Sequence, residues 1–320
     1  VISSGNQGQL SVEDYIDVLI DDPLVSAVGL YIEGLSDLVK FSDVALRALE
    51  SGMPIVAHKA GTSEIGAQLT VTHTGSLSGT DDLYETLFKR LGIIRVDSAV
   101  EMLETLKLLT ISGAPKGNRI AGLSCSGGDS TMLADGGEPL GLSFPQPSKE
   151  VAAELTHMLP PIATVSNPLD YTTPIWGNEE ALTKSNIVMF KDGYDAAIMV
   201  QDYPITVGGD SFDPYLADLR AFTTATRQAG IPGVVCSILP ENIDKRARDM
   251  MIESNIAPLQ GINDALKALA RSAEYGALFD QITRSGKKSG STDHLKLLPL
   301  LNNAEHAPIH AQDHLQIIDE

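Results

Sequence analysis

The chain has 320 residues, which is enough for two domains of ordinary size. Apolar residues make up 43% and aromatic residues 5%, so aliphatic side chains must pack the cores, as in α/β proteins with buried parallel strands. The formal net charge of −19 argues against nucleic acid or an anionic membrane as the main partner. Any bound phosphate must therefore be stabilised by local groups and not by the overall field.

Cysteine content and apolar runs define the expected compartment. Cys125 and Cys236 are too few for a disulfide framework, which favours a reducing cytoplasm. No apolar run approaches the length of a membrane span, and the sequence does not open with a signal-peptide pattern. The first residues are typical of the end of a strand, so we expect a further segment before them in the natural protein.

Strand and helix patterns alternate through the first third of the chain. Continuous apolar runs predict buried strands, and apolar residues at helical spacing predict the helices between them. The expected strands are 1–4, 27–32, 54–58 and 93–96, and the expected helices begin at Ser11 or cover 42–50, 81–91 and 99–109. This order predicts a doubly wound parallel sheet, in which ligands bind at the carboxyl ends of the strands. Gly5, Asn6 and Glu33 fall on that side.

A second α/β pattern begins after a linker with glycine and proline at 112–118. The expected strands are 119–124, 196–200 and 234–238, and the expected helices begin at Asp129 or cover 148–159, 215–229 and 264–279. The predicted fold class is α/β with two consecutive doubly wound parallel-sheet domains, at 1–112 and 113–279. The polar composition of residues 280–320 predicts a flexible linker.

The two halves are similar enough to be diverged copies of one another. Residues 52–56 (GMPIV) correspond to residues 230–234 (GIPGV), and residues 96–98 correspond to residues 259–261. The interval between these landmarks is 15 residues longer in the first copy. Insertions between structural landmarks often have a function, and this one contains a histidine loop at 72–80.

The histidine loop, THTGSLSGT, places one imidazole among hydroxyl groups and glycines just before a predicted helix. Its glycines let the backbone approach a ligand, its hydroxyls and amides can bind an anion, and the helix N-terminus adds positive charge. Neutral imidazole also has the lone pair that a nucleophile needs. His73 is therefore a candidate phosphoryl carrier, and an ordinary loop residue is the alternative.

A phosphohistidine needs an acceptor for its second ring nitrogen and donors for the phosphoryl oxygens. Glu33, at a neighbouring strand end, is the candidate acceptor, and a plain capping or solvated carboxylate is the alternative. The candidate donors are Thr74, Gly75 and Ser76 in the loop, with Ser126, Gly127 and Gly128 at the start of a helix in the second half. Each helix N-terminus adds about half a positive charge, which would stabilise a bound phosphate although the chain as a whole is negatively charged.

Several motifs resemble those of the NDP-forming acyl-CoA synthetases, relatives of succinyl-CoA synthetase. They are Gly5-Asn6-Gln7, Tyr31-Ile32-Glu33-Gly34, Lys59-Ala60-Gly61-Thr62-Ser63, the histidine loop, Ser126-Gly127-Gly128, Leu159-Pro160-Pro161 and Asn167-Pro168-Leu169-Asp170. The resemblance extends from Val1 to about Phe279 and implies two flavodoxin-like domains of the succinyl-CoA ligase type. It also implies that His73 is the phosphohistidine, that Glu33 orients it, and that the helix after Ser126 faces the phosphate.

The resemblance further implies the reaction and its ligands. A carboxylic acid, CoA and ATP would give acyl-CoA, ADP and phosphate through an acyl phosphate and the phosphohistidine. Gly5, Asn6, Asn167 and Asp170 would lie where the acid or CoA approaches, and an Asx-type turn before proline is an equal alternative for 167–170. No metal site is expected in the chain, because Mg²⁺ would bind with ATP outside it.

Other parts of such synthetases have no counterpart in this sequence. The CoA-binding Rossmann domain, the ATP-grasp domain and the opening strand and helix of the first ligase-like domain are missing. Residues 314–320 are similar to the start of an ATP-grasp region. We therefore expect the chain to be the middle of a longer, fused synthetase that forms a homo-oligomer in the cytoplasm, and expect it to be incomplete by itself.

Two other functional classes are weighed against this hypothesis. The alternative is a non-catalytic, acyl-CoA-sensing module of a protein acetyltransferase-like protein, which His73 argues against. A serine or thiol hydrolase is disfavoured, because residues 75–79 and 122–126 miss the G-x-S-x-G spacing. His306, His310 and His314 have helical spacing, but Pro308 interrupts it, so a solvated tail is favoured over a metal site.

Overall fold

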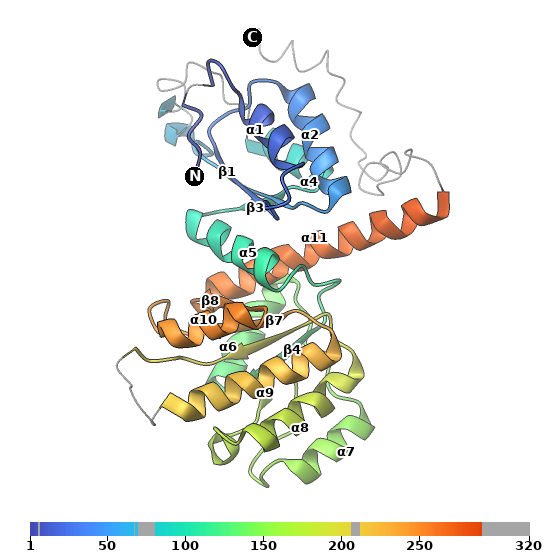
Figure 1. Ribbon diagram of the computed structural model, residues 1–320. Helices are drawn as coiled ribbons and strands as arrows, with labels where there is room; N and C mark the ends of the chain where they lie inside the picture. Colours follow the sequence, from blue (N-terminus) through green and yellow to red (C-terminus); the bar gives the residue numbers. More distant parts are fainter. Residues whose placement is uncertain (6, 67, 70–80, 206–211, 290–320) are drawn as a thin grey trace. The chain divides into compact units, whose positions relative to one another are not determined.

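A computed structural model of the chain describes residues 1–5, 7–66, 68–69, 81–205 and 212–289 (Figure 1). It contains two compact units, residues 1–97 with 278–289, and residues 98–277. Each unit has an α/β architecture with one sheet, and all strand pairs of these two sheets in the described chain are parallel. Within the described chain, no helix is both long and apolar enough to cross a membrane. The α/β fold class predicted from the sequence is confirmed.

The first unit is a three-stranded sheet with helices packed on it. Its elements are α1 (Val12–Leu19), β1 (Val28–Ile32), α2 (Leu38–Ser51), β2 (Ile55–Lys59), α4 (Asp81–Leu91) and β3 (Ile94–Val96). The strand order is β1-β2-β3, with Val28 opposite Ile55 and Val56 opposite Ile94. Alternate residues of β1 are buried against α2 and α4, whereas Tyr31 on the other face is 61% exposed. The carboxyl ends of β1 and β2 therefore lie at one edge, where Glu33 follows β1.

The second unit has a five-stranded sheet in the order β5-β4-β6-β7-β8. Its elements are α5 (Ala99–Ile111), β4 (Ile120–Ser124), α6 (Gly127–Gly137), α7 (Lys149–Met158), β5 (Leu169–Asp170), α8 (Glu179–Met189), β6 (Ala196–Val200), α9 (Asp213–Ala229), β7 (Gly233–Ser237), α10 (Lys245–Glu253), β8 (Ile256–Gln260) and α11 (Ile262–Ser289). Counted from β4, this is the 2-1-3-4-5 order of flavodoxin-like sheets.

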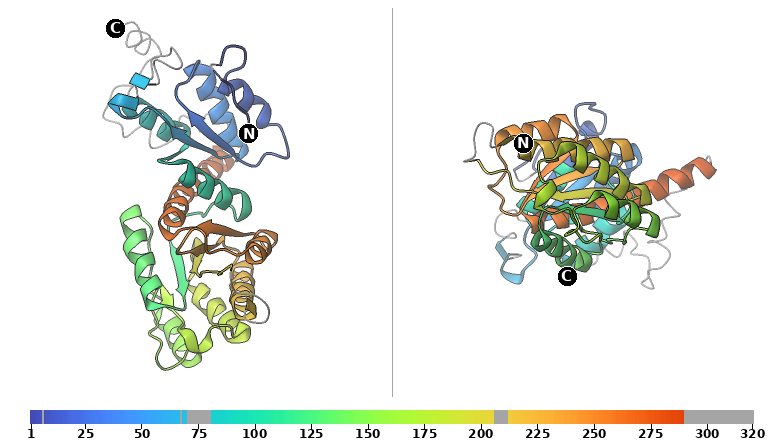
Figure 2. Two further views of the ribbon diagram at one scale, coloured as in Figure 1. Left: turned by 90° about the vertical axis from the view of Figure 1, so that its left-hand side faces the viewer. Right: turned by 90° about the horizontal axis from the view of Figure 1, so that it is seen from below.

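Two apolar cores cover the two faces of the second sheet, and Figure 2 shows helices on either side of it. Side chains of α7, α8, α9 and α10 form one core with the sheet. Side chains of α5, α6 and the first half of α11 form the other. All five residues of β4, β6 and β7 are buried, because these strands are covered on both faces. Only residues at the ends of these strands are therefore available to contact a ligand.

The internal correspondence seen in the sequence matches equivalent elements of the two units. Pro54 immediately precedes β2, and Pro232 immediately precedes β7. The helices before them also correspond, since α2 and α9 both end at a glycine with a left-handed conformation, Gly52 and Gly230. The 15 extra residues of the first copy fall between β2 and β3, the interval that contains the histidine loop.

Three local predictions differ from the structure. Residues 1–4 pair with no strand of the described chain, and the side chains of Val1 and Ile2 are exposed, so the predicted strand is wrong. Residues 280–289 are the last part of α11 and not a linker, and the pair of Arg284 with Asp280 one helical turn earlier (2.7 Å) adds to the stability of this part of the helix. Contacts group α5 with the second unit, although the predicted boundary at residue 112 places it in the first.

Candidate functional site

Glu33 lies directly after β1 and is half-buried at the carboxyl edge of the first sheet. Within the described chain, no hydrogen bond or ion pair engages its carboxylate. A carboxylate in this state can accept a hydrogen bond from an incoming donor without first losing another partner. A residue that orients an imidazole must be able to accept a hydrogen bond from its ring N–H in this way.

Three side chains from elsewhere fix the backbone that follows Glu33. The Gln7 side-chain amide donates to the Gly34 carbonyl (3.3 Å), and the Tyr84 hydroxyl accepts from the Leu35 amide (3.2 Å). The buried Glu13 carboxylate accepts from the Asp37 amide (3.4 Å). Gln7 thereby connects the turn at Gly5, whose φ is +54°, to the loop with Glu33. The N-terminal segment therefore contacts the loop with Glu33 through Gln7, and the assignment of Gly5 to the site stays a prediction.

Lys59, the last residue of β2, is a buried cation at the same edge that the sequence analysis did not assign to the site. It is 4% exposed, and its Nζ lies 4.8 Å from the centroid of the Tyr84 ring. Burial lowers the pKa of Lys59, whereas the charges of Asp81 and Glu33 oppose this shift. A buried positive charge here favours an anion at the strand ends. Its sequence signal was a lysine that follows the apolar run 55–57 and His58 at the end of a predicted strand.

His73, Thr74, Gly75 and Ser76 lie outside the described residues, as does Asn6. The described chain resumes at Asp81, the first residue of α4. Arg95 of β3 binds Asp81 (2.6 Å) and Glu85 (3.0 Å), which fixes the start of α4 against the sheet. The histidine loop therefore leads into an anchored helix N-terminus in the first unit.

The second predicted group of donors lies at the N-terminus of α6 in the second unit. Ser126 is the N-cap residue, and its hydroxyl accepts a hydrogen bond from the Asp129 amide (3.4 Å). Gly127 and Gly128 are exposed in the first turn of the helix. A Cβ atom at Gly127 would lie 3.4 Å from the Asp170 carboxylate, so Asp170 is beside this terminus, while its assignment to the substrate vicinity stays a prediction. The amides of this turn are accessible to a ligand.

Carboxylates surround this helix terminus, and they oppose the binding of an anion. Burial raises the pKa of Asp129, and the charges of Asp202 and Asp170 add to this rise. Burial and neighbouring carboxylates also raise the pKa of the Cys125 thiol to about 11, which makes Cys125 a poor nucleophile. Within the described chain, no group of three His, Cys, Asp or Glu residues could bind a metal ion. At this terminus, the backbone amides therefore favour the binding of an anion, whereas the negative charge of the neighbouring carboxylates opposes it.

The side chain of Asn167 is buried and forms hydrogen bonds with backbone groups. Its side-chain oxygen accepts from the Gly122 amide (2.9 Å), and its side-chain nitrogen donates to the carbonyls of Ile120 (2.8 Å) and Pro145 (3.0 Å). The residue is 3% exposed. These bonds tie the loop before β5 to β4 and support a packing role, so its assignment to the substrate vicinity stays a prediction.

Replacing Asn167 with alanine is expected to lower the free energy of unfolding by about 3 kcal/mol, because buried backbone groups of β4 lose their partners. Urea unfolding measures this. Asn118→Ala is the control, since its side chain makes one exposed hydrogen bond to Gly141, and a change below about 1 kcal/mol is expected. Equal effects of the two substitutions would refute the structural role of Asn167.

Comparisons with known proteins agree with this architecture. Residues 1–109 match the model of the succinyl-CoA ligase-like flavodoxin domain family. The α subunits of the ADP-forming acetate–CoA ligases I and II of Pyrococcus furiosus are 33% and 29% identical to the chain, over 84% and 83% of it. Acetyl-coenzyme A synthetase 1 of Ca. Korarchaeum cryptofilum, solved with phosphate and ADP, is 25% identical and superposes with a TM-score of 0.72 over 89% of the chain.

Residues 1–109 therefore form a succinyl-CoA ligase-like flavodoxin domain, and the chain is similar to the α subunits of ADP-forming acetate–CoA ligases. It spans 57% of the length of the two Pyrococcus subunits and 60% of the Korarchaeum synthetase. The family resemblance and the flavodoxin-like fold predicted from the sequence are confirmed. Three relatives are named ADP-forming acetate–CoA ligases, which are acid–thiol ligases.

Proposed function

We propose that the chain is the phosphoryl-transfer part of an ADP-forming acid–CoA ligase, which converts a carboxylic acid, CoA and ATP into acyl-CoA, ADP and phosphate. The observation that carries the proposal is the carboxylate of Glu33, which has no hydrogen bond or ion pair within the described chain and lies at the strand ends near the buried cation of Lys59. The names of the relatives support the reaction. CoA, the acid and Mg²⁺-bound ATP would meet the chain in an assembly with CoA-binding and ATP-grasp domains.

In the proposed mechanism, an imidazole nitrogen of His73 attacks the terminal phosphoryl group of ATP. The bond to the bridging oxygen breaks and ADP leaves. Glu33 accepts the hydrogen of the other ring nitrogen and stabilises the charged imidazole. The carboxylate of the acid then takes the phosphoryl group from His73, and the thiol of CoA displaces phosphate from the acyl phosphate.

The amides of Gly127 and Gly128 would supply a second set of donors to the phosphoryl group, beside those of Thr74, Gly75 and Ser76. Carboxylates close to Gly127 lower the affinity of this terminus for a dianion. We therefore assign it to a transient stage of the transfer, because a resting phosphate would be repelled by Asp170. Charge repulsion of this kind favours release of the group to the next acceptor.

Phosphorylation of the full-length protein with γ-labelled ATP tests the proposal. Acid-labile, base-stable label is expected on the wild type and is expected to be lost in His73→Asn. Glu33→Gln is expected to lower the labelling rate by roughly 100-fold, since the orienting acceptor of a histidine contributes on this order. The control is Glu50→Gln, an exposed carboxylate at the end of α2, which is expected to label like the wild type.

Labelling of His73→Asn at the wild-type level would refute the carrier hypothesis. Equal rates for Glu33→Gln and Glu50→Gln would refute the role of Glu33. Acyl-CoA binding by a wild type that takes up no label would favour the acyl-CoA-sensing regulatory module instead. The three outcomes are distinguishable within one set of proteins.

A further inference from the structure

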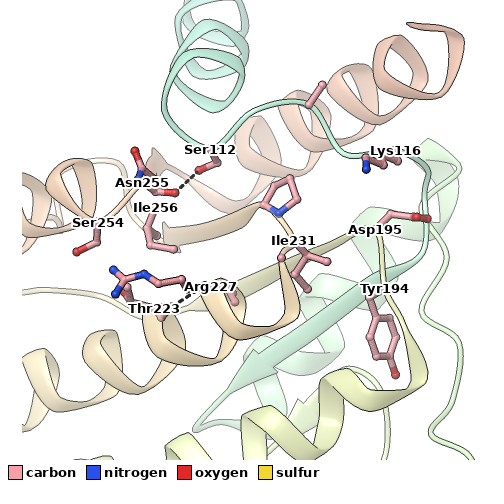
Figure 3. Close-up of a pocket in the computed structure, with 14 residues that line it drawn as sticks. Ser112, Lys116, Tyr194, Asp195, Thr223, Arg227, Ile231, Ser254, Asn255 and Ile256 are labelled. Atoms are coloured by element: carbon pink, nitrogen blue, oxygen red, sulfur yellow. Dashed lines mark hydrogen bonds between the residues drawn. The ribbon is translucent and has the colours of Figure 1, made fainter. Parts of the chain in front are cut away.

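A cavity of about 530 Å³ lies in the second unit, at the amino ends of the strands (Figure 3). Its wall includes Asp195, Pro232 and Asn255, which immediately precede β6, β7 and β8. The predicted phosphate-binding residues of this unit, Ser126, Gly127 and Gly128, follow the carboxyl end of β4 instead. The cavity is therefore separate from the edge of the sheet to which the proposed function is assigned.

Charged and polar groups concentrate at the two ends of the cavity. Figure 3 shows Arg227 and Ser254 at one end and Lys116 and Asp195 at the other, with Ile231 between them. Neither Lys116 nor Arg227 forms an ion pair or donates a side-chain hydrogen bond within the described chain. Asp195 uses one carboxylate oxygen to accept from the Arg119 amide (2.9 Å). Two free cations are thus available in a chain whose net charge is −19.

Thr223 adds an independent observation that points to a ligand. It lies one helical turn before Arg227 on α9, lines the cavity and is 7% exposed. Its Oγ1 is buried and has no hydrogen-bond partner. A buried hydroxyl without a partner is costly, and rotation of the threonine side chain about χ1 would present this hydroxyl to a ligand oxygen in the cavity. The guanidinium of Arg227 can bind the same anionic group through two parallel hydrogen bonds.

We propose that this cavity binds a nucleoside phosphate, with the phosphate at Arg227 and Thr223. The apolar middle, formed by Ile231, Pro232 and Ile256, would contact the sugar and base. The carboxylate of Asp195 supplies an acceptor for a hydroxyl or amino group at the far end, where a second phosphate would be repelled. The volume is within the range of cavities that bind small molecules. Because it lies away from the predicted catalytic edge, the ligand would act as an effector.

Isothermal titration of the full-length protein with AMP tests the proposal, because AMP is neither substrate nor product of an ADP-forming ligase. Binding of AMP with one site is expected, and Arg227→Ala is expected to weaken it at least 10-fold. Thr223→Val, which replaces the hydroxyl by a methyl group of similar size, is expected to weaken it several-fold. Arg248→Ala on α10 is the matched control, since it removes an exposed arginine outside the cavity, and its affinity is expected to equal that of the wild type.

Adenosine and inorganic phosphate distinguish the parts of the ligand, and both are expected to bind more weakly than AMP. Adenosine that binds as tightly as AMP would overturn the assignment of the phosphate end. Equal affinities of Arg227→Ala and Arg248→Ala would show that AMP occupies another site and would overturn the proposal. Absence of AMP binding at millimolar concentration would also overturn it, whereas none of these results bears on the labelling of His73.

Discussion

Replacing Gly276 with alanine is expected to destabilise the second unit by about 3 kcal/mol or more, although alanine favours a helix. Gly276 is buried within α11, where the helix packs against the segment before β4. A Cβ atom there would lie 1.8 Å from the Pro115 carbonyl oxygen and 3.1 Å from the Ala114 side chain. Because the nearest atom belongs to the backbone, neither a rotamer change nor a small shift can relieve the clash.

Thermal or urea unfolding measures this effect, and Gly136→Ala in α6 is the matched control. A Cβ atom at Gly136 would lie 2.7 Å from the tip of the Leu266 side chain, which can move. Its change in unfolding free energy is expected to stay within about 1 kcal/mol, because the gain in helix propensity offsets the repacking. If Gly276→Ala were as stable as Gly136→Ala, α11 would not pack on the 114–115 backbone.

Local patterns predicted the elements that have a clear apolar period. The strand at 196–200 and the helix at 81–91 have the predicted bounds, because each contains a continuous apolar run or a stripe of helical spacing. Helix α10 was not anticipated, since it buries only Ala247 and Met251 among charged residues. Helix α8 buries the polar residues Ser185 and Asn186, which breaks its apolar stripe. Their stability comes from tertiary packing that a local pattern does not contain.

In the candidate site too, some features follow from neighbouring residues in the sequence, whereas others depend on contacts between residues far apart in the sequence. The places of Glu33 and Ser126 at strand ends could be predicted, because each follows a recognisable strand and precedes a turn or helix. The role of Asn167 depends on Gly122 and Ile120, 45 and 47 positions away, and the burial of Lys59 depends on Tyr84. The cavity beside Arg227 combines segments from Ser112 to Ile256, so no single stretch of sequence indicates it.

Asp218 is expected to make the second unit less stable at high pH than at low pH. It is 1% exposed on α9, where it accepts hydrogen bonds from the Tyr171 hydroxyl (2.8 Å) and the Gly177 amide (2.7 Å). Burial raises the pKa of Asp218 to about 6 despite these bonds, whereas an unfolded aspartate has a pKa of about 3.9. Above pH 6 the folded state therefore contains a buried charge, at a cost of about 3 kcal/mol. This cost disappears as the pH falls from 6 towards 4.

Asp218→Asn is expected to remove this dependence, because an amide can accept from Gly177 and donate to the Tyr171 oxygen without a charge. The variant is expected to exceed the wild type by roughly 1–3 kcal/mol in unfolding free energy at pH 8, and the difference is expected to close near pH 4. Urea unfolding at pH 8, 6 and 4.5 measures it. Asp213→Asn, an exposed change on the same helix, controls for the loss of one negative charge. A difference between Asp218→Asn and the wild type that stays constant with pH would contradict the argument, since only a proton taken up by the folded state can make it close.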